Sequence, residues 1–170
     1  MKKILTLLFF SSLAIHAFAQ EKRVNSRLIP EKIKNYLQLN YPSVKGIEYF
    51  KKKDKDSLLY EVEFVLNKQE YNVRFSLEGS LVEIEREIEF DEIRASLQQI
   101  IKSALNENFA KVRIRKTQEV DPGAKKHFEV YVKTKKSNKF KAGFYRVMFD
   151  DSGKLLSIEE EKLSSIETVF

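Results

Sequence analysis

The chain has 170 residues, with 31 lysines and arginines against 25 aspartates and glutamates, and it contains no cysteine. The lack of cysteine excludes disulfides, thiol chemistry and a lipid anchor on a cysteine, so the fold has to rest on packing alone. With only two histidines, the chain also offers no cluster of histidine and cysteine for zinc chemistry.

Residues 1–19 are predicted to be a cleavable signal peptide. Lys2 and Lys3 form a charged start, an apolar run follows at 4–10, and residues 17–19 read Ala-Phe-Ala, the small-x-small pattern that signal peptidase cuts after. The apolar run is too short to span a membrane. We therefore expect a periplasmic or secreted chain, for which the net charge of +6 favours an acidic protein partner or an anionic envelope surface over nucleic acid.

The first structural unit is expected to begin with a helix. Pro30 stands where a missing N–H costs nothing, apolar residues recur at helical spacing over 33–41, and Pro42 ends the pattern. Strands are expected at 44–51 and at 58–66, followed by a β-hairpin at 71–85 with Gly79 in its turn.

The same order is expected again in the second half. Asp91 is suited to cap a second helix, whose apolar positions run from Ile93 to Phe109. Alternating strands are expected from 112 and around 128–132, and a second hairpin at 145–159 has Gly153 in its turn.

The two halves align with a period of roughly 70 residues. Tyr60-x-Val62-x-Phe64 matches Phe128-x-Val130-x-Val132, and Gly79 matches Gly153. The predicted fold is α+β: two tandem α-β-β-β-β repeats, each a helix packed on one face of a four-stranded antiparallel sheet. Their expected bounds are 20–90 and 91–163, with a tail at 164–170; whether the two sheets join is left open.

These motifs resemble the PepSY-like domain that is related to β-lactamase-inhibitor (BLIP-like) proteins. The resemblance is carried by Tyr41-Pro42-Ser43-Val44, Glu48-Tyr49, Tyr60-x-Val62-x-Phe64 and Tyr71-x-Val73-x-Phe75-x-x-x-Gly79. The second copy departs from the pattern, since no proline follows Phe109 and Arg115-Lys116 stands where an aromatic residue is expected. The resemblance implies a helix-backed antiparallel sheet and an exported binding or inhibitory role, and it transfers no catalytic residue.

No catalytic site, metal site or cofactor is predicted from the residues. His16 falls in the predicted signal peptide and His127 stands alone. Alternating acids at 83–89 share one strand face, which is more typical of a solvated face than of acid–base catalysis or a calcium site. The chain is therefore interpreted as a non-enzyme.

The side of the sheets that faces away from the helices is the predicted functional surface. In the first unit this side is mostly acidic, and in the second it is basic with aromatic and sulfur-containing neighbours. The first set is Glu61, Glu63, Arg74, Glu83, Glu85 and Glu87, and the second is Arg113, Arg115, Tyr131, Lys133, Phe144, Arg146 and Met148.

Two interpretations of this surface stay open. One is a wet face held by cross-strand ion pairs, and the other is a binding face. In the second interpretation, Tyr131, Phe144 and Arg146 anchor a protein partner, while Arg113, Arg115 and Lys133 steer toward an acidic patch. The functional hypothesis is an exported non-catalytic binding module, such as an inhibitor or modulator. The alternative is a structural or self-associating envelope protein without a specific ligand.

Overall fold

The computed structural model describes residues 22–54 and 57–161. The expected signal peptide and the expected tail at 164–170 lie outside the described residues. The helices are α1 (Glu31–Asn40) and α2 (Ala95–Asn108), with short 3-10 turns at Ser26–Leu28 and Phe90–Glu92. The strands are β1 (Lys22–Arg23), β2 (Glu48–Asp54), β3 (Ser57–Leu66), β4 (Gln69–Phe75), β5 (Leu81–Ile88), β6 (Ala110–Asp121), β7 (His127–Lys135), β8 (Gly143–Asp150) and β9 (Leu155–Glu161).

All nine of these strands form one antiparallel sheet in which each strand lies beside its neighbour in sequence. The α+β class and the antiparallel pairing are confirmed, while the two expected four-stranded sheets are joined into one nine-stranded sheet, which answers the question left open by the sequence. The cause is β6, which runs on to Asp121, so that its last residues pair with β5 (Ile84 opposite Asp121, Ile88 opposite Thr117). A further strand at the edge, β1, was not predicted.

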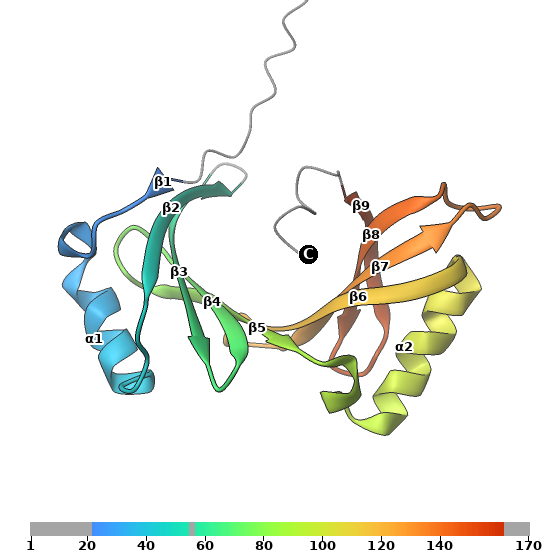
Figure 1. Ribbon diagram of the computed structural model, residues 1–170, viewed down its shortest axis with the longest axis horizontal. Helices are drawn as coiled ribbons and strands as arrows, with labels where there is room; N and C mark the ends of the chain where they lie inside the picture. Colours follow the sequence, from blue (N-terminus) through green and yellow to red (C-terminus); the bar gives the residue numbers. More distant parts are fainter. Residues whose placement is uncertain (1–21, 55–56, 162–170) are drawn as a thin grey trace, which may run out of the picture.

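The sheet is strongly bent, and both helices lie on its outer side (Figure 1). Register shifts within β6, after Ala110 and after Ile114, mark irregularities of the bulge type that bend a strand and increase its twist. The inner side is covered by neither helix. We call the side chains of β2–β9 that point away from the helices the concave face.

Each helix packs on its own part of the sheet. From α1, Ile33 and Leu37 are buried against β3 and β4, and from α2, Leu97, Ile101 and Leu105 are buried against β7 and β8. The strand residues buried in these two clusters are Tyr60, Val62, Phe64, Val73 and Phe75 in the first, and Ile88, Val130, Val132, Tyr145, Val147 and Phe149 in the second.

Helix α2 begins later than expected. The 3-10 turn at Phe90–Glu92 takes the first positions, closed by a capping box in which Glu89 and Glu92 satisfy each other's backbone N–H groups, and the helix starts only at Ala95. Neither helix in the described part of the chain has the length and apolar character that a membrane-spanning helix requires.

The turns of the two predicted hairpins pack directly on the helices. Gly79 and Gly153 both have a positive φ, +78° and +86°. A Cβ atom on Gly153 would lie 2.6 Å from Leu97 Cδ1 and 2.9 Å from Ile100 Cγ2, and one on Gly79 would lie 3.1 Å from Lys32 Cβ. Glycine is therefore required at Gly153 both for the backbone conformation and for the close approach of α2.

We predict that Gly153→Ala lowers the free energy of unfolding by about 2–3 kcal/mol, because it adds a steric clash to the cost of a positive φ. Gly123→Ala is the matched control, since Gly123 has φ +81° but nothing within 4 Å of the added Cβ. The control should lose only about 1 kcal/mol. Urea unfolding of both variants measures the difference, and equal losses would contradict the packing of the turn on α2.

Candidate binding face

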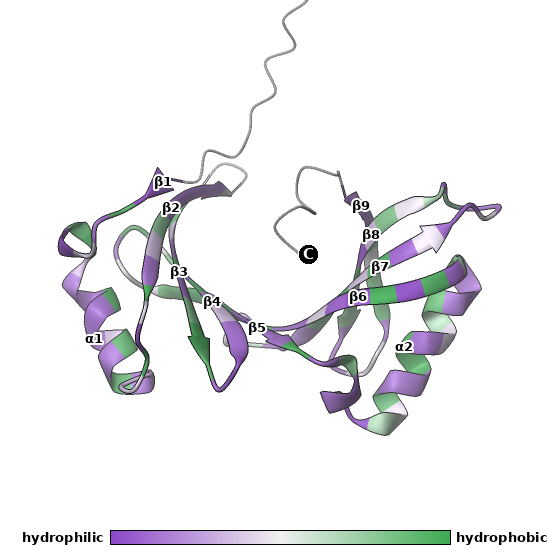
Figure 2. Cartoon of the chain, viewed as in Figure 1, coloured by the Kyte–Doolittle hydropathy of each residue, from purple (hydrophilic) through white to green (hydrophobic). Residues whose placement is uncertain are grey.

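The concave face is built by simple alternation along the strands. Hydrophobic and hydrophilic residues alternate along them, as Figure 2 shows most plainly for β6, because one side packs on a helix and the other stays wet. Because β5 pairs with β6, the acidic positions predicted for the first unit and the basic positions predicted for the second lie side by side on one continuous surface.

An arginine surrounded by three carboxylates organises the first half of this face. The guanidinium of Arg74 on β4 donates from Nε to Glu61 at 2.9 Å, contacts Glu85 through Nη2 at 2.9 Å, and also pairs with Glu83. Lys52 on β2 reaches the Glu61 carboxylate at 3.1 Å. Because Glu61 is only 1% exposed, this network holds a buried charge in place.

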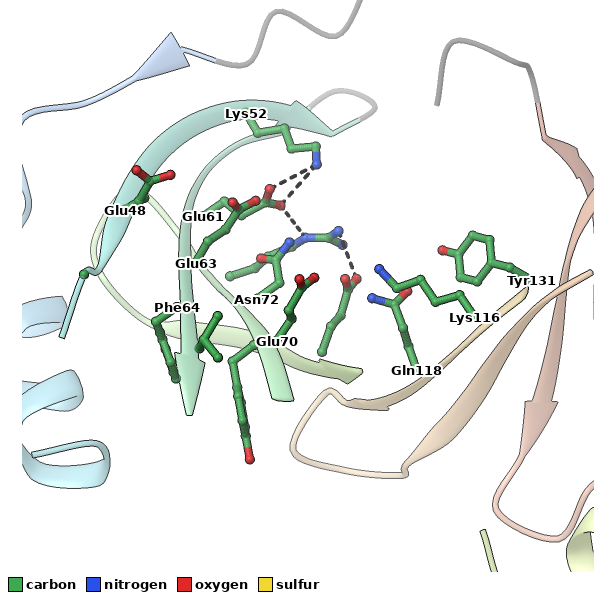
Figure 3. A pocket seen from close by; sticks show the side chains of 15 residues that line it. Glu48, Lys52, Glu61, Glu63, Phe64, Glu70, Asn72, Lys116, Gln118 and Tyr131 are labelled. Atoms are coloured by element: carbon green, nitrogen blue, oxygen red, sulfur yellow. Dashed lines mark hydrogen bonds and ion pairs between the residues drawn. The ribbon is translucent and has the colours of Figure 1, made fainter. Parts of the chain in front are cut away.

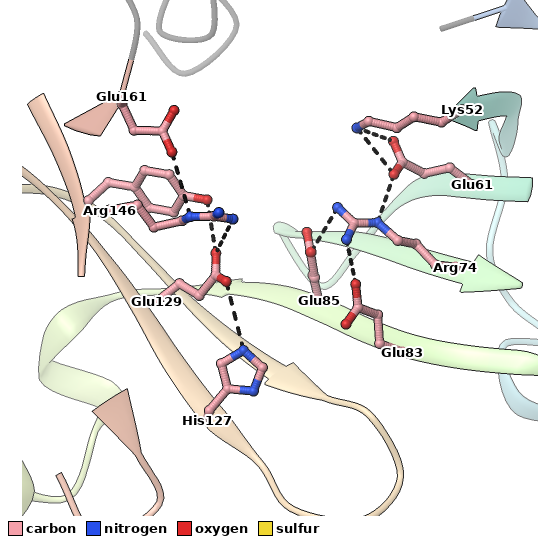
Figure 4. A network of polar contacts seen from close by, with 10 residues as sticks. Lys52, Glu61, Arg74, Glu83, Glu85, His127, Glu129, Arg146 and Glu161 are labelled. Atoms are coloured by element: carbon pink, nitrogen blue, oxygen red, sulfur yellow. Dashed lines mark hydrogen bonds and ion pairs between the residues drawn. The ribbon is translucent and has the colours of Figure 1, made fainter. Parts of the chain in front are cut away.

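A second arginine, Arg146, is likewise surrounded by three carboxylates in the other half of the face. Arg146 on β8 lies 2.5 Å from Glu159, 3.5 Å from Glu129 and 3.6 Å from Glu161, and the Tyr131 hydroxyl donates to Glu129 at 3.0 Å. The carboxylate of Glu129 is buried, as that of Glu61 is. Figure 4 shows the two guanidinium groups pointing toward the space between the networks.

A cleft of about 640 Å³ opens on the concave face where β2–β5 meet β6 and β7 (Figure 3). Its floor and walls carry both signs of charge together with Asn72, Gln118 and Tyr131. The carboxylates that line it are Glu48, Glu61, Glu63, Glu70 and Glu85, and the cations are Lys52, Arg74 and Lys116.

The pKa values of two lining carboxyls are shifted in opposite directions. Burial alone would raise the pKa of Glu61, but the charges of Lys52 and Arg74 outweigh it and hold that pKa below its ordinary value. For Glu85, burial outweighs the opposing charge of Arg74, and with the repulsion of Glu129 it raises the pKa to about 7. The cleft therefore contains one carboxyl that is firmly ionised and one that titrates near neutral pH.

The predicted site residues have the following places. Arg113 lies exposed on β6 opposite Lys133, and Lys133 lies opposite Phe144, with its ammonium 5.1 Å from the centre of that ring. Tyr131 lies opposite Arg146, and Met148 lies opposite Glu129. Arg115 falls at the register shift of β6.

These seven residues therefore do not form one uniformly basic patch, because Arg146 and Tyr131 are already engaged with carboxylates of the same chain.

Sequence reasoning missed several residues of the cleft and of the second network. Glu129 was not singled out, although the alignment of Tyr60-x-Val62 with Phe128-x-Val130 already gives it the position in the second half that Glu61 has in the first. Lys116, which lies 3.0 Å from Glu87, was missed because the register shift of β6 changes which residues point into the cleft.

Residues 22–54 and 57–161 contain no group of three His, Asp or Glu side chains that could hold a metal ion. His127 lies 3.7 Å from Glu129, at the edge of the second network. The described residues thus show ion pairs and a cleft, and no metal centre among them.

We predict that Glu61→Gln and Glu85→Gln change stability in opposite ways. Glu61 has a lowered pKa in the folded state, so its ionised form stabilises the fold above its ordinary pKa, and the loss of its charge should cost about 3 kcal/mol at pH 8. Glu85 has a raised pKa, so its favourable contribution is present at low pH and is lost as the pH rises through 7.

Glu85→Gln should therefore be neutral or stabilising by about 1–2 kcal/mol at pH 8, with the gain disappearing toward pH 5. Denaturant unfolding at pH 5, 7 and 8 checks both variants against the unaltered chain. A loss of stability for Glu85→Gln at pH 8 as large as that for Glu61→Gln would contradict this electrostatic description.

A scan against protein-family models gives no match, and a search of curated proteins gives none either. Solved structures from Bacteroides are similar in fold. A DUF2874 family protein from Bacteroides ovatus ATCC 8483 has a TM-score of 0.62 at 17% identity, covering 78% of this chain and 87% of that one. A protein described as a candidate periplasmic protein, from Bacteroides eggerthii DSM 20697, has a TM-score of 0.61 at 19% identity, covering 78% and 88%.

A BLIP-like protein from Bacteroides fragilis NCTC 9343 has a TM-score of 0.59 at 15% identity, covering 78% of this chain and 86% of that one. At these identities the likeness shows the fold alone. The expected resemblance to BLIP-like proteins is thus confirmed for the fold, while the PepSY name and the two copies stay predictions.

Proposed function

We propose that this chain is an exported, non-catalytic module that binds a protein partner through its concave face, as an inhibitor or modulator would. The observation that carries the proposal is the cleft of about 640 Å³, which is lined by the Arg74 network and by Tyr131 of the second network, on a sheet face that neither helix covers. Fold neighbours described as BLIP-like and as a candidate periplasmic protein support the same role and compartment. The pattern of residues 1–19 supports export.

The networks suit this face to binding because they hold its side chains in place before a partner arrives. Arg74 and Arg146 each contact three carboxylates, and such multiple charge-assisted contacts restrict the long side chains. Side chains that are already ordered lose less conformational entropy on binding. The exposed cations Arg113 and Lys133, which lie opposite each other on β6 and β7, keep the predicted role of steering toward an acidic patch on the partner.

We also propose that the two halves are copies of one ancestral unit. The order of a helix followed by four strands occurs twice, from α1 to β5 and from α2 to β9. Gly79 and Gly153 pack on the helix of their own half, and Glu61 and Glu129 are buried carboxylates at aligned positions. The units at 20–90 and 91–163 would then be fused through the β5–β6 pairing.

We predict that the double variant Arg113→Glu with Lys133→Glu abolishes capture of a partner by crosslinking in intact cells, because it replaces the two exposed cations that steer the approach with acids. The matched control is Arg94→Glu with Lys102→Glu, which makes the same change of charge at exposed positions of the outer side. Mass spectrometry of the crosslinked product measures capture. Equal capture by the two double variants would contradict a role for the concave face.

A second candidate function is self-association in the envelope, and the charges at the two ends of the sheet favour it. One end carries Lys22, Arg23 and the lysines at 51–53, whereas the other end, β9, carries glutamates at 159–161. Strand edges that have no neighbour among the described residues and carry opposite charges can join head to tail, and such an interface does not close on itself.

If this second function holds, the molar mass measured by light scattering should rise with concentration at low salt, without a plateau, and return to the monomer value at about 0.5 M salt, where the Debye length is short. Constant monomer mass at all concentrations would exclude self-association through the edges and leave the binding module as the proposal.

A further inference from the structure

One end of the second half of the sheet carries a dense group of lysines. This end consists of the start of β6, the end of β7 and the turn between β7 and β8, and Ala110 of β6 lies opposite Lys135 of β7. The sequence has no acid at 108–118 or at 130–149, the two stretches that build this end. Five exposed lysines of these stretches are here called the basic tip: Lys111, Lys135, Lys136, Lys139 and Lys141.

The charges of the basic tip are not compensated, unlike those in the middle of the sheet. There Arg74, Lys116 and Arg146 each contact a carboxylate. None of the five tip lysines forms an ion pair with a described side chain. Beside the tip, Arg113 and Lys133 lie opposite each other on neighbouring strands, and like charges at such positions repel. An anionic partner at this end of the sheet would relieve the repulsion.

The turn that carries three of these lysines is longer than the turn at the same place in the first half. Residues 67–68 connect β3 with β4, whereas residues 136–142 connect β7 with β8. Phe140 holds the longer turn in place, since its ring centre lies 4.9 Å from that of Phe109 and 5.5 Å from that of Tyr145, and its backbone N–H donates to Ser137 Oγ at 3.0 Å. Figure 1 shows this turn, in orange, projecting from the end of the sheet, where a broad surface can reach it.

The residue type at the basic tip indicates which anionic partner fits it. All five residues are lysines, whose flexible side chain carries a compact point charge, whereas the planar fork of arginine suits bidentate pairing with one defined carboxylate or phosphate. Lysine is also depleted, and arginine enriched, where proteins bind each other. Flexible point charges at a projecting end therefore suit a broad array of phosphates, such as the headgroups of an anionic bilayer. The expected export through residues 1–19 favours this surface over nucleic acid.

We propose that the basic tip binds the phosphate headgroups of anionic phospholipids and holds the chain reversibly at a membrane surface. Each lysine close to such a surface strengthens binding by roughly fivefold, and the attraction fades within a Debye length. The inference goes beyond the proposed function, because it concerns lysines other than Arg113 and Lys133 and a different kind of partner. No tip lysine lines the cleft, so the membrane site and the cleft do not share side chains.

The test is cosedimentation with lipid vesicles, and it uses the chain from Gln20 onward, because the apolar run at 4–10 would by itself enter any bilayer. Vesicles with about one-third phosphatidylglycerol should bind the chain at low salt, whereas vesicles of phosphatidylcholine alone should not. Raising the salt to about 0.5 M should release the chain, because the Debye length becomes short.

Two quadruple variants with the same change of net charge locate the binding. The tip variant combines Lys135→Gln, Lys136→Gln, Lys139→Gln and Lys141→Gln. The control variant changes four exposed lysines outside the tip: Lys45→Gln, Lys53→Gln, Lys68→Gln and Lys154→Gln. The tip variant should bind the anionic vesicles about a hundredfold more weakly, and the control variant should stay within about threefold of the unaltered chain. Arginine at the same four tip positions should preserve binding, because the charge is kept.

The proposal is overturned if phosphatidylcholine vesicles bind equally well, if the tip variant binds like the control variant, or if the arginine variant loses binding. It is also overturned if no vesicle binds while the tip variant loses a crosslinked protein in cells, since the tip would then dock on an acidic protein. The proposed function is tested separately by Arg113→Glu with Lys133→Glu, which leaves the tip lysines unchanged. If that variant still captures its partner while the tip variant loses the vesicles, this inference stands and the proposed function fails.

Discussion

The pairing of β5 with β6 is the interaction on which the rest of the molecule depends. Without it the chain would consist of two helix-backed sheets, each with a small wet face. With it, the two faces become one bent surface, and the cleft forms where the second half meets the first. The same pairing brings Glu85 of the first half close enough to Glu129 of the second for their charges to interact. The continuous concave face and its electrostatics thus follow from a few backbone hydrogen bonds.

The buried carboxylates explain why two arginines of the concave face, despite the positive net charge of the chain, are not available to pair with a partner. Glu61 and Glu129 lie almost out of contact with water, where an unpaired charge is costly, and arginines from the neighbouring strands compensate them. As a result, the guanidinium groups of Arg74 and Arg146 are held in ion pairs with carboxylates of the same chain. A net charge counted over the chain therefore says little about the sign of the cleft, because the electrostatic potential at a site depends on nearby charges and their burial.

Much of the fold could be predicted because its signals are local. The apolar stripe from Ile33 to Tyr41 predicted α1, the alternation around Val62 and Val130 predicted buried strands, and Gly79 and Gly153 marked the hairpin turns. The prediction failed at the start of α2, where a 3-10 turn comes first, and at the division into two sheets. Whether the two sheets join depends on how far β6 extends beyond its pairing with β7. The alternation of hydrophobic and polar residues in the sequence does not show this length.

By itself, the sequence determined the class, the helix and strand faces, the turn glycines and which residues stay on the wet side, because alternation and helical spacing act between near neighbours. Only the tertiary structure decided which of those wet residues meet. It paired Arg74 with Glu61, Glu83 and Glu85, enclosed Arg146 among carboxylates, and aligned Glu48, Glu63, Asn72 and Glu85 in one row. Register across strands sets these contacts, since a shift of one residue moves every side chain to the other face.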